Sequence, residues 1–171
     1  TSAQGGQVTM TTSGAGIGRF TYDPPTGFEG TDTFTYTLSD NTNATTSASN
    51  RTATVTITVS GMIWFINNNA ASCTSNGCGR LSNPYSTLAA FNGVNDGIDA
   101  GFVRHPAAND NIFVYESATA YTLGITLLAN QKLIGQDSTT SLSTITGITP
   151  VTGSAALPSM NLGAPTTLIE N

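Results

Sequence analysis

The feature that most constrains the fold is a regular alternation of apolar and polar residues in the first 60 positions. Four short stretches carry it, at Val8 and Met10; Phe20 and Tyr22; Phe34, Tyr36 and Leu38; and Val55, Ile57 and Val59. Alternation with period two places the apolar side chains on one face of a β-strand. Turn-forming segments such as Pro24-Pro25-Thr26-Gly27 separate the stretches. We therefore predict four half-buried strands of an antiparallel sandwich.

Composition supports an all-β chain and excludes two classes of partner. Charged residues make up 9% of the 171 residues, against about 25% in an average protein. Thr, Ser, Asn and Gly replace them, and Thr favours strands over helices. The five basic residues are scattered, so no patch exists that would neutralise nucleic-acid phosphates. The longest apolar run, Met62 to Ile66, is far shorter than the ~20 residues that span a bilayer.

The first third of the chain resembles a known family. The run from Gly18 to Asp40, followed by Thr52 to Val59, contains an aromatic strand, a Pro-Gly turn, Gly30-Thr31-Asp32 and a second aromatic strand, in that order. This order resembles the C-terminal part of the bacterial immunoglobulin-like, cadherin-like repeats of large surface proteins. The resemblance implies a domain of about seven strands, of which four are visible. We therefore expect an incomplete Ig-like sandwich over residues 1–60.

The alternation of apolar residues and threonine ends near Gly61, where we place a domain boundary. We expect a short helix, capped by Ser86, to run through Phe91. Short strands are expected at 112–115, 124–128 and 131–135, separated by turns at a solenoid-like spacing. Residues 138–171 contain three prolines and little pattern, which indicates a loop excursion.

This second part also carries a resemblance. Its supporting pieces include Trp64-Phe65-Ile66-Asn67 and the run from Asp110 to Glu116. They resemble the N-terminal cap and first coil of right-handed parallel β-helix proteins of bacterial surfaces and secretions. The expected fold class is thus all-β, with an incomplete Ig-like antiparallel sandwich at residues 1–60 and the start of a parallel β-helix at residues 61–171.

The two cysteines, Cys73 and Cys78, flank an Asn-Gly turn pair that is able to bring their sulfur atoms together. We expect a disulfide, which agrees with an oxidising, extracellular compartment. The alternatives are two reduced thiols or half of a metal site, and a metal site would need further ligands.

Several residues are weak candidates for metal binding or modification. Asp23, Asp32 and Asp40 flank strand ends, where calcium-stiffened repeats place oxygen ligands, so calcium is a possible cofactor. The Asp-x-Asp runs of such sites are absent, and turn capping is the favoured interpretation. Asn43 and Asn50 fit the N-glycosylation pattern, which arises by chance in Thr-rich sequences.

We expect no catalytic residue in this chain. His105 has no Ser or Cys motif nearby and is predicted to be a surface-loop histidine. The carboxylates near the first coil lie at its entry: Asp96, Asp99, Asp110 and Glu116. Large aromatic residues are predicted to pack in the core instead of forming a sugar-binding platform: Trp64, Phe65, Tyr85, Phe91 and Phe102.

Three functions remain open on the sequence alone. The first is a non-catalytic structural or adhesive segment of a large secreted or cell-surface bacterial protein. The second is the non-catalytic N-terminal part of a β-helix polysaccharide lyase or hydrolase. The third is the subunit of an extracellular fibre that strand donation completes. The expected partners are flanking modules of the same polypeptide or neighbouring copies, with a cell-surface or carbohydrate ligand as a further possibility.

Overall fold

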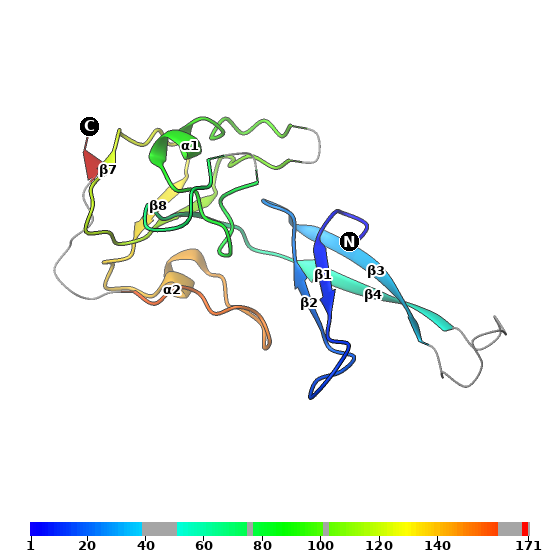
Figure 1. The fold of residues 1–171 in the computed structure, drawn as a ribbon. Coiled ribbons are helices and arrows are strands. Elements are labelled where there is room, and N and C mark those ends of the chain that lie inside the picture. Colours follow the sequence, from blue (N-terminus) through cyan, green and yellow to red (C-terminus); the bar gives the residue numbers. More distant parts are fainter. Residues whose placement is uncertain (39–50, 75–76, 101–102, 161–168, 171) are drawn as a thin grey trace. The chain divides into compact units, whose positions relative to one another are not determined.

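The computed structural model describes residues 1–38, 51–74, 77–100, 103–160 and 169–170. The chain divides into two compact units, Thr1–Ser60 and Gly61–Asn171 (Figure 1). Each unit is described by itself below. No helix among the described residues has the length and apolar character needed to cross a membrane.

Unit 1 contains two antiparallel strand pairs. Strand β1 (Gln7–Met10) pairs with β2 (Phe20–Asp23), and β3 (Gly30–Leu38) pairs with β4 (Arg51–Val59). All nine residues of β3 lie opposite a residue of β4 without a bulge, from Gly30 opposite Val59 to Leu38 opposite Arg51. The four strands and their antiparallel pairing confirm the expectation from the alternating pattern.

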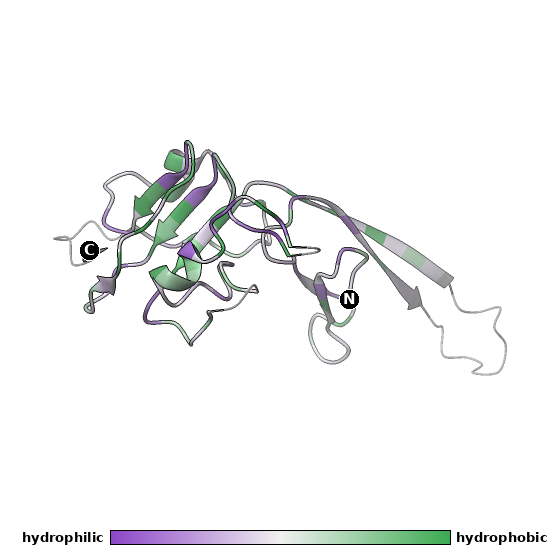
Figure 2. Ribbon diagram, turned by 90° about the horizontal axis from the view of Figure 1, so that it is seen from above, coloured by the Kyte–Doolittle hydropathy of each residue, from purple (hydrophilic) through white to green (hydrophobic). Residues whose placement is uncertain are grey.

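The alternation in the sequence separates the β3–β4 pair into two chemically different faces. One face carries the buried side chains of Asp32 and Phe34, with Val55 directly opposite Phe34. The other face carries only threonines, paired across the strands as Thr31 with Thr58, Thr33 with Thr56, Thr35 with Thr54 and Thr37 with Thr52. Figure 2 shows the resulting alternation of hydrophobic and paler residues along this ribbon. The rings of Phe20 and Phe34 meet edge to face at 5.0 Å and join the two strand pairs.

Unit 2 is built on a parallel sheet. Strand β5 (Ile63–Ile66) pairs with β6 (Asn111–Val114), and β6 pairs with β8 (Lys132–Gly135). A second, two-residue parallel pairing joins β7 (Tyr121–Thr122) to β9 (Ile169–Glu170). Parallel strands need long crossover connections. Here 44 residues (67–110) connect β5 to β6, and 17 residues (115–131) connect β6 to β8.

Strands β5 and β6 are covered on both faces, whereas β8 is buried only at Ile134. One face contributes Trp64, Ile66, Ile112 and Val114 to a core that also holds Leu88 and Phe91 of helix α1 (Leu88–Asn92). The other face contributes Phe65, Phe113 and Ile134 to a second core, where they pack with Leu142 of helix α2 (Leu142–Thr146). Strands buried on both faces are mostly apolar, and for this reason β5 and β6 lack the alternation seen in unit 1.

The structure corrects three details of the sequence analysis. Helix α1 is capped by Thr87, whose hydroxyl accepts a hydrogen bond from the Ala90 N–H, whereas Ser86 binds the backbone of Cys73. Residues 124–128 form no strand, because their backbone is held by the side chains of Asn92 and Asn95. The segment after residue 138, predicted to be a loop, contains α2 and β9.

Candidate functional site

Asp32, a weak calcium candidate, is buried and fully engaged with protein donors. One carboxylate oxygen accepts the backbone N–H groups of Gln4 (2.9 Å) and Thr33 (2.7 Å). The other accepts the hydroxyls of Tyr22 (2.7 Å) and Ser2. Burial raises the pKa of Asp32, but these hydrogen bonds lower it by more, so the pKa lies below its usual value. The carboxylate therefore ties the N-terminal turn and β2 to β3.

The remaining calcium and glycosylation candidates are Asp23, Asp40, Asn43 and Asn50. Asp23 ends β2, where it lies opposite Gln7. Asp40, Asn43 and Asn50 lie outside the described residues. Across the described ranges, no group of three or more His, Cys, Asp or Glu side chains is arranged to hold a metal ion. A calcium role for Asp23, Asp32 and Asp40 stays a prediction.

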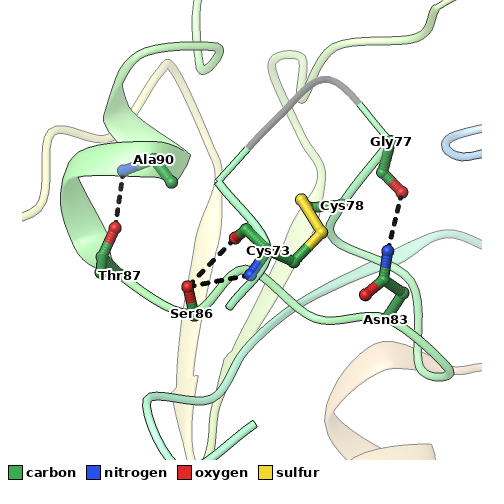
Figure 3. Close-up of a disulfide and its surroundings, with 7 residues drawn as sticks. All are labelled: Cys73, Gly77, Cys78, Asn83, Ser86, Thr87 and Ala90. Carbon is green, nitrogen blue, oxygen red and sulfur yellow. Dashed lines mark hydrogen bonds between the residues drawn. A yellow bond between two sulfur atoms is a disulfide. The ribbon is translucent and has the colours of Figure 1, made fainter. Parts of the chain in front are cut away.

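Cys73 and Cys78 are joined by a disulfide, with a Cα–Cα distance of 5.8 Å (Figure 3). Both cysteines are buried in the core that contains Trp64 and Tyr85. The Ser86 hydroxyl lies 3.2 Å from both the N–H and the carbonyl oxygen of Cys73 and secures one end of the loop.

The disulfide loop belongs to a cap over the outer edge of β5. Phe65 donates its N–H to Gly79 and accepts one from Tyr85, and Asn67 donates to the carbonyl of Tyr85. The Trp64 and Tyr85 rings stack above this edge, with centroids 6.3 Å apart. Gly79 has a φ of +100°, and a Cβ there would lie 2.5 Å from the Trp64 ring, so the cap needs glycine at this position.

His105 is mostly buried, in contrast to the predicted surface-loop histidine. Its side chain is 10% exposed, and its Nδ1 lies 2.8 Å from a carboxylate oxygen of Asp96. The neighbouring Asp99 accepts the His105 N–H and pairs with Arg104. Hydrogen bonds from the Ile98 N–H and from His105 lower the pKa of Asp96, and those from Arg104 and the His105 N–H lower the pKa of Asp99. The Nε2 atom is buried and has no hydrogen-bond partner among the described residues. The contacts of Asp96 and Asp99 with His105 hold this loop histidine in place.

Asp110 also has structural partners, whereas the contact of Glu116 with Gln136 is made by its backbone. Asp110 accepts the indole N–H of Trp64 at 2.8 Å and the N–H of Ala107 at 2.8 Å. The N–H of Glu116 donates to the side chain of Gln136. Trp64, Tyr85 and Phe91 lie in one core and Phe65 in the other, which leaves none of these four rings as an exposed platform; Phe102 lies outside the described residues.

Unit 1 contains an apolar groove that the sequence analysis did not identify. Met10, Gly18, Phe20, Phe34, Tyr36 and Val55 line it. Its accessible volume is about 220 Å³. Met10 and Phe20 are 38% and 40% exposed although they face this groove. The only signal in the sequence was the count of strands, four where the family resemblance implies about seven.

Comparison with known proteins finds a similarity for the first unit. The family model described as "Bacterial Ig domain" matches residues 1–60, the same range as unit 1. Domains of this kind are generally non-catalytic and are typical of extracellular or surface proteins. No curated protein and no solved structure gave a significant match. Residues 1–60 are therefore similar to a bacterial Ig domain.

Proposed function

We propose that this chain is a non-catalytic structural or adhesive segment of a secreted or cell-surface bacterial protein, in which an Ig-like unit precedes the first coils of a parallel β-helix. The bacterial Ig match and the disulfide support the extracellular part of this proposal. The engagement of Asp32, Asp96, Asp99 and Asp110 with protein donors supports a non-catalytic role.

The observation that carries the β-helix proposal is a column of in-register side chains across the parallel sheet. Trp64 of β5, Ile112 of β6 and Leu133 of β8 lie side by side. Their exposed fractions are 1%, 0% and 38%. Stacked coils of a solenoid bury such columns continuously, and only a terminal coil leaves its member exposed.

The two outer edges of the sheet also differ, since one is covered and the other is open. The cap around the disulfide covers β5, whereas no strand among the described residues pairs with the outer edge of β8. The parallel pairing of β7 with β9 supports a second stacked face of the same coils. A solenoid capped at one end and extended from the other accounts for all three observations.

The proposal is tested by measuring what Leu133 contributes in two contexts. In the 171-residue chain, Leu133→Ala should lower the free energy of unfolding of unit 2 by about 1 kcal/mol, because the side chain is partly exposed. In the native polypeptide the same change should cost about 2–5 kcal/mol, the usual range for a fully buried leucine.

Ile112→Ala is the matched control, since Ile112 is already fully buried and should cost about 2–5 kcal/mol in both contexts. Equal, small costs for Leu133→Ala in both contexts would contradict a further coil on β8.

The surface assignment is tested separately by protease shaving of intact cells that make the protein. Recovery of its peptides only from the cytosol, with Cys73 and Cys78 reduced, would contradict secretion.

A further inference from the structure

Unit 1 carries an unprotected strand edge beside its apolar groove. The β3–β4 pair has two outer edges. The outer edge of β3 is partly covered, since the Ala3 N–H donates to the Thr33 carbonyl at 2.8 Å. The outer edge of β4 pairs with no strand in the described part of the chain. Such an edge presents a row of backbone donors and acceptors to any strand that fits.

The sequence of β4 lacks the devices by which proteins protect an edge. Arg51–Val59 contains no proline, glycine, lysine or acidic residue, and its only charged residue stands at its first position. Its register with β3 contains no bulge. Nine regular residues are long for an edge, because edge strands are commonly kept short, charged or kinked. The edge is therefore suited to pairing.

We propose that two copies of this chain associate through β4, which pairs antiparallel with β4 of the second copy about a two-fold axis at Val55. The full overlap of two nine-residue strands sets this register. It places Val55 opposite its own counterpart, Thr54 opposite Thr56 and Ala53 opposite Ile57. A two-fold interface requires such self-complementarity.

The chemistry of the two faces favours this register. Residues directly opposite in an antiparallel pair lie on the same face of the sheet. Full overlap brings apolar residues against apolar residues on the groove side and threonines against threonines on the other side. A shift by one residue would place threonines opposite apolar side chains and mix the two faces. No charge lies within the paired strands except at their ends, so no repulsion opposes the contact.

The groove gives the dimer its apolar contribution. Val55 stands at the centre of the proposed contact and also lines the groove with Phe34 and Tyr36. Pairing at Val55 brings the inward residues of the second β4 next to this surface and extends the sheet from two strands to four. A strand of different pattern, with charged or unmatched residues, would leave the groove uncovered.

The test is the oligomeric state of the full 171-residue chain by sedimentation velocity over a wide concentration range. One strand contact is smaller than the roughly 1,200 Å² of stable interfaces, so a weak dimer in exchange with monomer is expected. Hydrogen exchange at the amides of residues 51–59 should slow as the dimer forms.

A double variant, Thr54→Lys with Thr56→Lys, places lysines directly opposite each other twice in the dimer. Like charges in this position destabilise strand pairing, and the dimer should weaken about tenfold or more. The matched control is Thr33→Lys with Thr35→Lys. It adds the same charge to the same threonine face, one strand away from the contact, and should leave the dimer intact.

Three results would overturn the inference: a monomer at every concentration, a dimer that both double variants weaken equally, or open-ended fibres in place of a dimer. A monomer at every concentration would show that the outer edge of β4 does not pair with a second copy. The β-helix proposal is tested by the free energy of unfolding of the Leu133→Ala variant in unit 2, whereas this inference is tested by the oligomeric state. The failure of one is therefore distinguishable from the failure of the other.

Discussion

Replacement of Asp32 by alanine tests how unit 1 is held together. The change removes the acceptor for four donors, the N–H groups of Gln4 and Thr33 and the hydroxyls of Ser2 and Tyr22. A buried donor left without a partner costs about 1–3 kcal/mol. Gln4 is exposed and the residues that supply the other three donors are half-buried, so water replaces the carboxylate at part of these donors. We therefore expect a loss of about 3 kcal/mol.

Hydrogen exchange followed by mass spectrometry measures this loss in one unit at a time. A loss of about 3 kcal/mol corresponds to roughly 100-fold faster exchange of the amides in β2 and β3. Unit 2 serves as an internal control, because its only tryptophan, Trp64, reports its state by fluorescence. Thr35→Ala, on the exposed face of the same strand, should change stability by less than about 0.5 kcal/mol. Equal protection in Asp32→Ala and wild type would refute the reasoning.

The remaining predictions concern pH and the cap of unit 2. Because the pKa of Asp32 is lower in the folded state than in the unfolded state, its stabilising effect is present above the ordinary Asp pKa of about 4 and is lost as the pH falls through the folded value. Exchange protection of unit 1, corrected for the intrinsic rate at each pH, should fall below about pH 4 in wild type and fall less in Asp32→Asn; equal losses would argue against this assignment. Reduction of the disulfide should lower the stability of unit 2 by about 2 kcal/mol, as the loop-entropy relation gives for so short a loop, and a denaturation midpoint of Trp64 fluorescence that does not move would contradict this. Gly79→Ala should destabilise unit 2 by at least about 2 kcal/mol, since it combines a positive φ with a steric clash against Trp64, whereas Gly77→Ala, with no atom within 4 Å of its Cβ, should be neutral; similar effects of the two changes would show that the cap tolerates a side chain.

The alternation of residues predicted unit 1 well because each strand there has one apolar and one polar face. Phe34 and Val55 identify the inner face, and the intervening threonines identify the outer one. The buried position of Asp32 could not be predicted. A carboxylate at an inward position contradicts the pattern, and its four donors come from residues 2 to 33, which only the folded chain brings together.

Unit 2 was harder to predict, since β5 and β6 are buried on both faces and carry no alternating pattern. Residues 124–128 are as apolar as a strand, yet Asn92 and Asn95 bind their backbone from more than 25 residues away. His105 was misjudged for a similar reason. A histidine in a polar loop is usually exposed, but Asp96 contacts the ring of His105 and Asp99 accepts its backbone N–H. Side chains that bind distant backbone leave no local signature.

The cap on β5 has a consequence for the order in which the strands of unit 2 pair. Residues 79–85 cover this edge and precede β6 in the chain, so β5 is closed on one side by a segment nearer to it in sequence than its parallel neighbour. Each later strand then has a single free edge on which to settle, β6 on β5 and β8 on β6. The order of the strands along the sheet is thus the same as their order along the chain. Because the outer edge of β5 is covered, a later strand is not able to pair with it. Slow parallel pairing then proceeds one strand at a time from the open edge.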